Sequence, residues 1–180
     1  MPAGTKDDPW QLSTAPRTSI YTMWADETSD PPTLFCQVGS TQLRYQLKCI
    51  DDLHAWLVEQ DGWVDLGAAE EQMPAKEGTV EAWGRSEDNP VGGWYGLRKS
   101  YRGRFGMYVP PLLEPLGKAE LTHEPRNNKA RCLLSDLRSR APSSGLLAAR
   151  AAFVAHCEEM QRQPITRPHS WPCAQKRTGV

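Results

Sequence analysis

The sequence predicts an α+β fold: a small antiparallel sheet with a packed helix, followed by a winged-helix-like unit of two helices and a hairpin. Three observations predict it. Short β-forming segments precede an amphipathic helical pattern, and a basic, glycine-rich stretch then leads into a proline-started helix and a second hairpin pattern. We expect a lead-in over 1–17, an α+β domain over 18–134 and a helix with a disordered basic tail over 135–180. Within the domain, 18–62 forms the β-β-β-α part and 63–134 the winged-helix-like part.

The β-β-β-α part is expected to contain three strands, over 19–25, 33–38 and 42–49. The last two are joined by a tight turn at 39–41 (GST), which predicts a hairpin. In the third strand apolar side chains alternate with Arg44 and its polar neighbours, as in a half-buried strand. A helix is expected to open at the aspartates of positions 51 and 52, because apolar residues then recur at helical spacing and acidic side chains suit a first turn.

The winged-helix-like part contains weaker signals. We expect short strands at 63–66 and 80–83, a helix at 110–117, and hairpin strands at 119–124 and 129–134. Glu70, Glu71 and Glu81 are expected to lie on a solvated face. In the C-terminal section, an amphipathic helix is predicted over 146–161.

The leading candidate for function is the basic stretch 94–104 (WYGLRKSYRGR) together with the second hairpin. Arg and Lys side chains neutralise phosphates, and Arg and Asn can also contact base edges. In a winged helix the second helix enters the major groove while the hairpin touches the backbone or the minor groove. The sequence therefore predicts a non-enzymatic protein, regulatory in one interpretation, that binds duplex DNA. The candidate contacts are Arg98, Lys99, Arg102 and Arg104 in the stretch, which would form a basic helix, with Arg126, Asn127, Lys129 and Arg131 in the hairpin that would form the wing.

The charge distribution leaves other interpretations open. Residues 50–90 carry eleven acidic and two basic side chains, whereas residues 91–132 carry eight basic and three acidic ones. The basic side chains can therefore pair with the acidic half of the same chain. They can also pair between two chains, which would make the protein a homodimerisation or protein–protein interaction module. The glycines of the stretch disfavour a regular helix and suit an anion-binding loop.

Other functional classes receive little support from the sequence. The GxGxxG, Walker A, HExxH and GxSxG motifs are absent, so no catalytic residue, cofactor or metal site is predicted. The five cysteines form no CxxC pair and their number is odd, which argues against a disulfide framework. The sequence shows neither a secretory leader nor a long apolar run, so we expect a cytoplasmic protein without a membrane partner.

Several runs of residues carry a resemblance to a known group of proteins. They are 78–85 (GTVEAWGR), 89–97 (NPVGGWYGL), 102–114 (RGRFGMYVPPLLE) and 126–128 (RNN). In these runs the chain is similar to a family of uncharacterised actinobacterial proteins, over residues 8–132. The resemblance implies no particular activity, and it does not extend into the tail.

Overall fold

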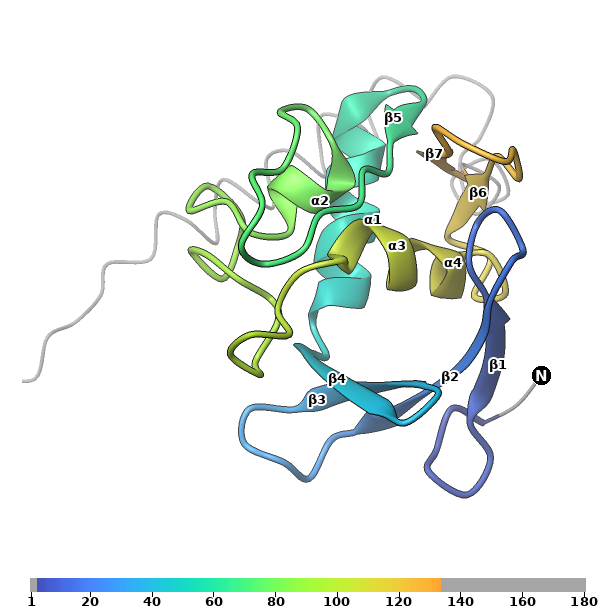
Figure 1. Ribbon diagram of the computed structural model, residues 1–180, viewed down its shortest axis with the longest axis vertical. Helices are drawn as coiled ribbons and strands as arrows, with labels where there is room; N and C mark the ends of the chain where they lie inside the picture. The colour runs from blue at the N-terminus through green and yellow to red at the C-terminus, as the bar shows by residue number, and fades with distance from the viewer. Residues whose placement is uncertain (1–2, 134–180) are drawn as a thin grey trace, which may run out of the picture. The chain divides into compact units, whose positions relative to one another are not determined.

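A four-stranded antiparallel sheet lies at the base of Figure 1, which shows the computed structural model; the structure describes residues 3–133. The strands lie in the order β1-β2-β3-β4, so each pairs with its neighbour in sequence. Their bounds are Trp10–Ser13 for β1, Ile20–Asp26 for β2, Thr33–Val38 for β3 and Thr41–Gln46 for β4.

Alternation of side chains explains the sheet, since residues two apart share a face. Tyr21 and Met23 on β2 are buried, whereas Trp24 lies on the opposite face. The three predicted strands are confirmed, although the third ends at Gln46. Strand β1 lies in the predicted lead-in and was not predicted. Leu12 is its single buried residue, and one buried position does not produce an alternating pattern that would reveal a strand.

Helix α1 (Cys49–Gln60) follows the sheet and confirms the predicted helix. Asp51 and Asp52 occupy its first turn, where carboxylates suit the helix dipole. The apolar side chains of Leu53 and Leu57 are buried. The helix ends at Gln60, and the capping residue Asp61 adopts the left-handed conformation with φ 52°.

A second sheet and three short helices complete the described part of the chain. The sheet contains β5 (Val64–Asp65), β6 (Ala119–Leu121) and β7 (Lys129–Cys132) in the order β5-β7-β6. The predicted strand at 63–66 and the predicted hairpin are thereby confirmed. The helices are α2 (Val80–Trp83), α3 (Phe105–Tyr108) and α4 (Pro110–Leu113).

Two predictions for the second half need correction. Residues 80–83 form helix α2 and not a strand, because Thr79 Oγ1 accepts the Ala82 amide at 3.2 Å and caps a helical turn. The winged-helix-like arrangement is not confirmed. The stretch 94–104 contains no helix, and α3 and α4 have four residues each, most of them buried. The predicted helix at 146–161 and the rest of 135–180 lie outside the described residues.

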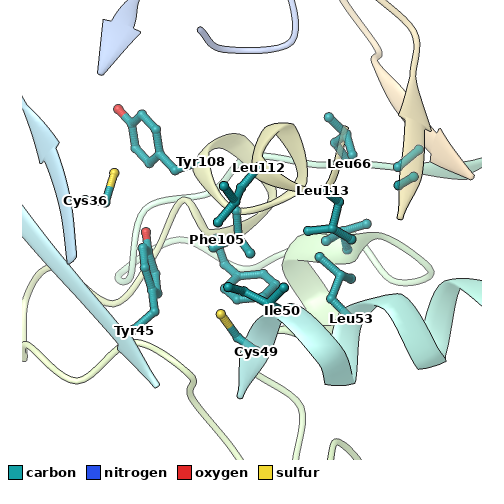
Figure 2. Close-up of a cluster of buried hydrophobic side chains, with 14 of the residues drawn as sticks. Cys36, Tyr45, Cys49, Ile50, Leu53, Leu66, Phe105, Tyr108, Leu112 and Leu113 are labelled. Carbon is teal, nitrogen blue, oxygen red and sulfur yellow. The ribbon is translucent and has the colours of Figure 1, made fainter. Parts of the chain in front are cut away.

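The hydrophobic core lies on the inner face of the four-stranded sheet. Helices α1, α3 and α4 all lie on this side of the sheet (Figure 1). Phe105 of α3 is 1% exposed and packs edge-on against Tyr45 of β4, with 5.8 Å between the ring centroids. Figure 2 shows Cys36 and Tyr45 at the sheet end of this cluster and Leu53 at the helix end. The opposite face of the sheet therefore has no helix from residues 3–133 against it.

Candidate functional site

The basic stretch 94–104 is a loop that runs along the edge strand β4. Gly96 forms a bridge with Tyr45, and the Leu97 amide donates a hydrogen bond to the Arg44 carbonyl at 2.8 Å. The loop then folds back on itself. A Cβ at position 96 would lie 2.5 Å from the Arg102 Cα, so the close approach requires glycine. The glycines thus shape a tight loop that follows the sheet edge.

Two of the predicted phosphate contacts in this loop pair with acidic side chains. Arg102 donates from Nε and Nη2 to Glu71 Oε1 at 3.1 and 2.7 Å, and its amide donates to Oε2 at 3.0 Å. Hydrogen bonds from the Arg102 side chain hold the pKa of Glu71 below its usual value. Arg104 pairs with Glu70 through one hydrogen bond from its side chain, and this pair is more exposed. The acidic half of the chain therefore neutralises both arginines.

A buried carboxylate holds the end of the basic loop in place. Glu81 is 1% exposed, so the prediction that it lies on a solvated face is wrong. It accepts the amides of Arg104 at 3.1 Å and Gly106 at 2.8 Å, and it forms an ion pair with Arg85. Arg85 also donates to the Ala69 carbonyl at 3.0 Å. This arrangement ties the acidic segment 69–71 to the basic loop through one buried charge pair.

A pocket of about 420 Å³ lies between the basic loop and the β3–β4 hairpin. Its lining includes Leu43 of β4 and Tyr108 of α3, as well as the paired side chains Glu70 and Arg104. Its volume falls within the range of ligand pockets. Because its arginine already has a carboxylate partner, the pocket presents no unbalanced charge that would identify a ligand class.

Arg98 of the loop and Arg44 of β4 are both exposed and both donate hydrogen bonds to Gln42. Arg98 donates to the Gln42 carbonyl at 3.0 Å, and its guanidinium lies 4.0 Å from the centroid of the Tyr101 ring. Arg44 of β4 donates to Gln42 Oε1 at 3.4 Å and lies 5.5 Å from the centroid of the Phe35 ring. The two arginines therefore share Gln42 as a polar neighbour, and each lies over an aromatic ring.

These two arginines and Lys99 are exposed, and none forms an ion pair with a carboxylate in the part of the chain that the structure describes. Arg44 was not among the predicted contacts. The signal that identifies it is the hairpin register, since the tight turn after Val38 places Arg44 directly opposite Phe35.

The hairpin residues do not join the basic loop. Arg131 pairs with Glu120 at 2.7 Å and Lys129 with Asp65 at 3.4 Å, while Arg126 and Asn127 are exposed in the turn. Hydrogen bonds from Lys76 and then Lys129 lower the pKa of Asp65. In Figure 1 the β6–β7 hairpin lies on one side of the helices and the basic loop on the other. The eight predicted contacts therefore divide into two separate groups.

A thiol and an imidazole meet where α1 packs on β7. Cys132 Sγ lies 3.5 Å from His54 Nε2. Burial raises the pKa of the Cys132 thiol, which keeps it protonated near neutral pH and unsuited to nucleophilic attack. Within residues 3–133, no group of three His, Cys, Asp or Glu side chains is placed to hold a metal ion, and no helix is long and apolar enough to cross a membrane.

Comparison with known proteins gives one match. No curated protein and no solved structure matches the chain significantly. The predicted resemblance to an uncharacterised family is confirmed, whereas an actinobacterial origin stays a prediction. Since the family model covers residues 2–133, the chain belongs to a family of unknown function, DUF6855.

Proposed function

We propose that the protein is a non-enzymatic nucleic-acid-binding protein with weak sequence preference, whose principal phosphate contacts are Arg44, Arg98 and Lys99. The observation that carries the proposal is that these three exposed cations gather at one edge of the sheet without a carboxylate partner among the described residues. Cations of this kind release condensed counterions from a phosphate backbone when they bind it. Cytoplasmic location belongs to the same proposal.

The proposal moves the interface relative to the one predicted from the sequence. Arg102 is held by three hydrogen bonds to Glu71 and would have to give them up to contact a phosphate. Arg104 can exchange its carboxylate partner for a phosphate more easily, because that partner, Glu70, has a side chain that is 59% exposed. We therefore treat Arg104 as an auxiliary contact, and Arg126 of the hairpin as a cation outside the interface.

Homodimerisation receives less support than nucleic-acid binding. The sequence suggested a homodimer held together by pairing of the acidic half of one chain with the basic half of another. In the structure Glu70 and Glu71 pair with arginines of their own chain, which removes these charges from an interface between copies.

The salt dependence of binding tests the proposal. We expect fluorescence anisotropy with a labelled DNA oligomer to show binding that weakens as salt rises. The Arg98→Ala/Lys99→Ala variant should reduce the slope of log K against log salt by about 0.7 to 0.9 for each cation removed. Arg126→Ala is the matched control, since it removes an exposed arginine from the far hairpin and should leave the slope unchanged.

Two results would reject the proposal. One is an absence of salt-dependent binding by the wild type at micromolar protein. The other is a slope that the double variant leaves unaltered, which would mean that these cations do not contact phosphate.

A further inference from the structure

We infer that the bound nucleic acid is single-stranded, and that its bases stack on flat side chains at the outer face of the four-stranded sheet. This inference rests on the proposed function, because it takes the same three cations as its phosphate contacts. It adds the strandedness of the ligand and the surface that receives the bases.

The first observation is a row of flat groups that crosses three strands. Trp24 lies opposite Phe35, and Phe35 lies opposite Arg44, so the three side chains share one face of the sheet. The rings of Trp24 and Phe35 are stacked, with 5.2 Å between centroids and 9° between planes, and Arg44 lies over Phe35 from the next strand. Because Phe35 is covered by a neighbour on each side, the flat surfaces open to a base are those of Trp24 and Arg44 at the two ends of the row. Aromatic rings and guanidinium planes are the groups on which proteins stack unpaired bases.

The second observation is a further cation–aromatic pair in the basic loop, beside the edge strand β4. The guanidinium of Arg98 lies over the ring of Tyr101, which is 41% exposed and also lines the pocket between the basic loop and the hairpin. Arg98 donates a hydrogen bond to the backbone carbonyl of Gln42 and Arg44 donates one to its side-chain oxygen, so Gln42 positions both guanidinium groups before any ligand arrives. Pre-positioned groups bind at a lower entropic cost.

The third observation is the polar character of the neighbouring row. Thr22, Gln37 and Gln42 lie opposite one another on the same face, and Gln42 Nε2 donates to Gln37 Oε1 at 3.5 Å. Hydroxyl and amide groups can hydrogen-bond base edges. Because no described helix packs on this face, a strand that crosses it would meet cations, flat groups and amides together.

The same features argue against a duplex as the ligand. Duplex bases present their edges in the grooves and hide their faces in the stack, so flat side chains gain little from them. Reading a major groove commonly uses a helix. The basic loop contains none, and helices α3 and α4 are short and mostly buried.

The test compares three labelled probes by fluorescence anisotropy at one salt concentration. They are an oligothymidylate, an abasic oligomer of equal length, and a duplex with the same number of phosphates per strand. We expect the abasic oligomer to bind about tenfold more weakly than the oligothymidylate, because it offers phosphates without bases. The duplex should bind more weakly than the oligothymidylate as well.

A matched pair of variants tests whether Tyr101 belongs to the surface on which the bases stack. Tyr101→Leu should weaken oligothymidylate binding about tenfold and leave the affinity for the abasic oligomer unchanged. Trp63→Leu is the control, since Trp63 is a similarly exposed ring beneath a guanidinium, that of Arg131, in the far hairpin. Trp24→Leu is a second test on the sheet itself, with circular dichroism to show that the variant is folded.

The outcomes separate the inference from the proposed function. Equal binding of the abasic oligomer and the oligothymidylate, or preference for the duplex, would overturn the inference while the phosphate contacts stand. If none of the three probes binds, the proposed function fails and the inference fails with it.

Discussion

Glu81 shows how one residue can organise the surroundings of the candidate site. Its carboxylate is buried, accepts two backbone amides of the 104–106 segment and pairs with Arg85. A buried charge is tolerated only when it is paired and hydrogen-bonded. Arg85 meets this condition and also lies over the Trp94 ring, 4.5 Å from its centroid. The local structure of the basic loop therefore depends on a residue that never reaches the surface.

We predict that Glu81→Gln lowers the free energy of unfolding by about 3 kcal/mol, because it leaves the Arg85 guanidinium buried without its counter-charge. Glu70→Gln is the control, since it also removes a carboxylate paired with arginine but at an exposed position. It should cost at most about 1 kcal/mol. Urea unfolding of the three proteins measures both values, and equal losses would contradict the assignment of Glu81 as the organising residue.

At the scale of elements, the acidic segment and the basic loop are packed backbone to backbone. A Cβ at position 103 would lie 2.5 Å from the Glu71 amide nitrogen and 2.6 Å from the Ala69 carbonyl oxygen. The Arg104 amide also donates to the Ala69 carbonyl at 2.8 Å. The pairing of Arg102 with Glu71 therefore rests on a contact that only glycine allows.

Gly103→Ala should separate these two segments and lower the free energy of unfolding by about 1 to 3 kcal/mol, the usual cost of overpacking. Gly62→Ala is the matched control, because a Cβ there would have no neighbour closer than 3.9 Å. Its effect should stay within about 0.5 kcal/mol. Thermal or urea unfolding gives both numbers. A Gly103→Ala protein as stable as the control would mean that the two segments do not pack this closely.

The sequence predicted elements whose patterns are local and missed those that depend on partners. Alternation revealed β2, and helical spacing revealed α1. Helix α2 was mistaken for a strand because four residues are too few to distinguish the two periods, and its cap at Thr79 was overlooked. The winged-helix-like arrangement rested on charge and element order, neither of which determines whether a helix forms.

For the candidate site, the sequence identified the cations of the loop but not their partners. The opposite charges of residues 50–90 and 91–132 left pairing within the chain as one of several alternatives, and the structure shows that Arg102 and Arg104 do pair in this way. Which cations remain unpaired depends on tertiary packing. Arg44 is distant from Arg98 in sequence and joins it only because residues 95–97 run along β4.

Across residues 3–133, several carboxylates have lowered pKa values, and several buried thiols and hydroxyls have raised ones. Hydrogen bonds from Thr28 lower the pKa of Asp26, and hydrogen bonds from Lys76 and Arg102 lower those of Asp65 and Glu71. Burial raises the pKa of the Cys36 and Cys49 thiols and of the Tyr21 hydroxyl. The carboxylates thus stay charged in the fold more readily than in the unfolded chain, and the thiols stay protonated.

These shifts predict a plateau of stability between about pH 5 and pH 8. As pH falls below about 4.5, these carboxylates become protonated in the unfolded chain while they stay ionised in the folded protein. The free energy of unfolding therefore decreases as pH falls toward and through their folded pKa values. Above about pH 8.5 the unfolded thiols ionise while Cys36 and Cys49 keep their protons, so stability falls again. Urea midpoints measured across pH give the profile. Glu71→Gln should flatten the acid side and leave the alkaline side unchanged, and a wild-type midpoint that keeps rising below pH 4 would contradict the lowered pKa values.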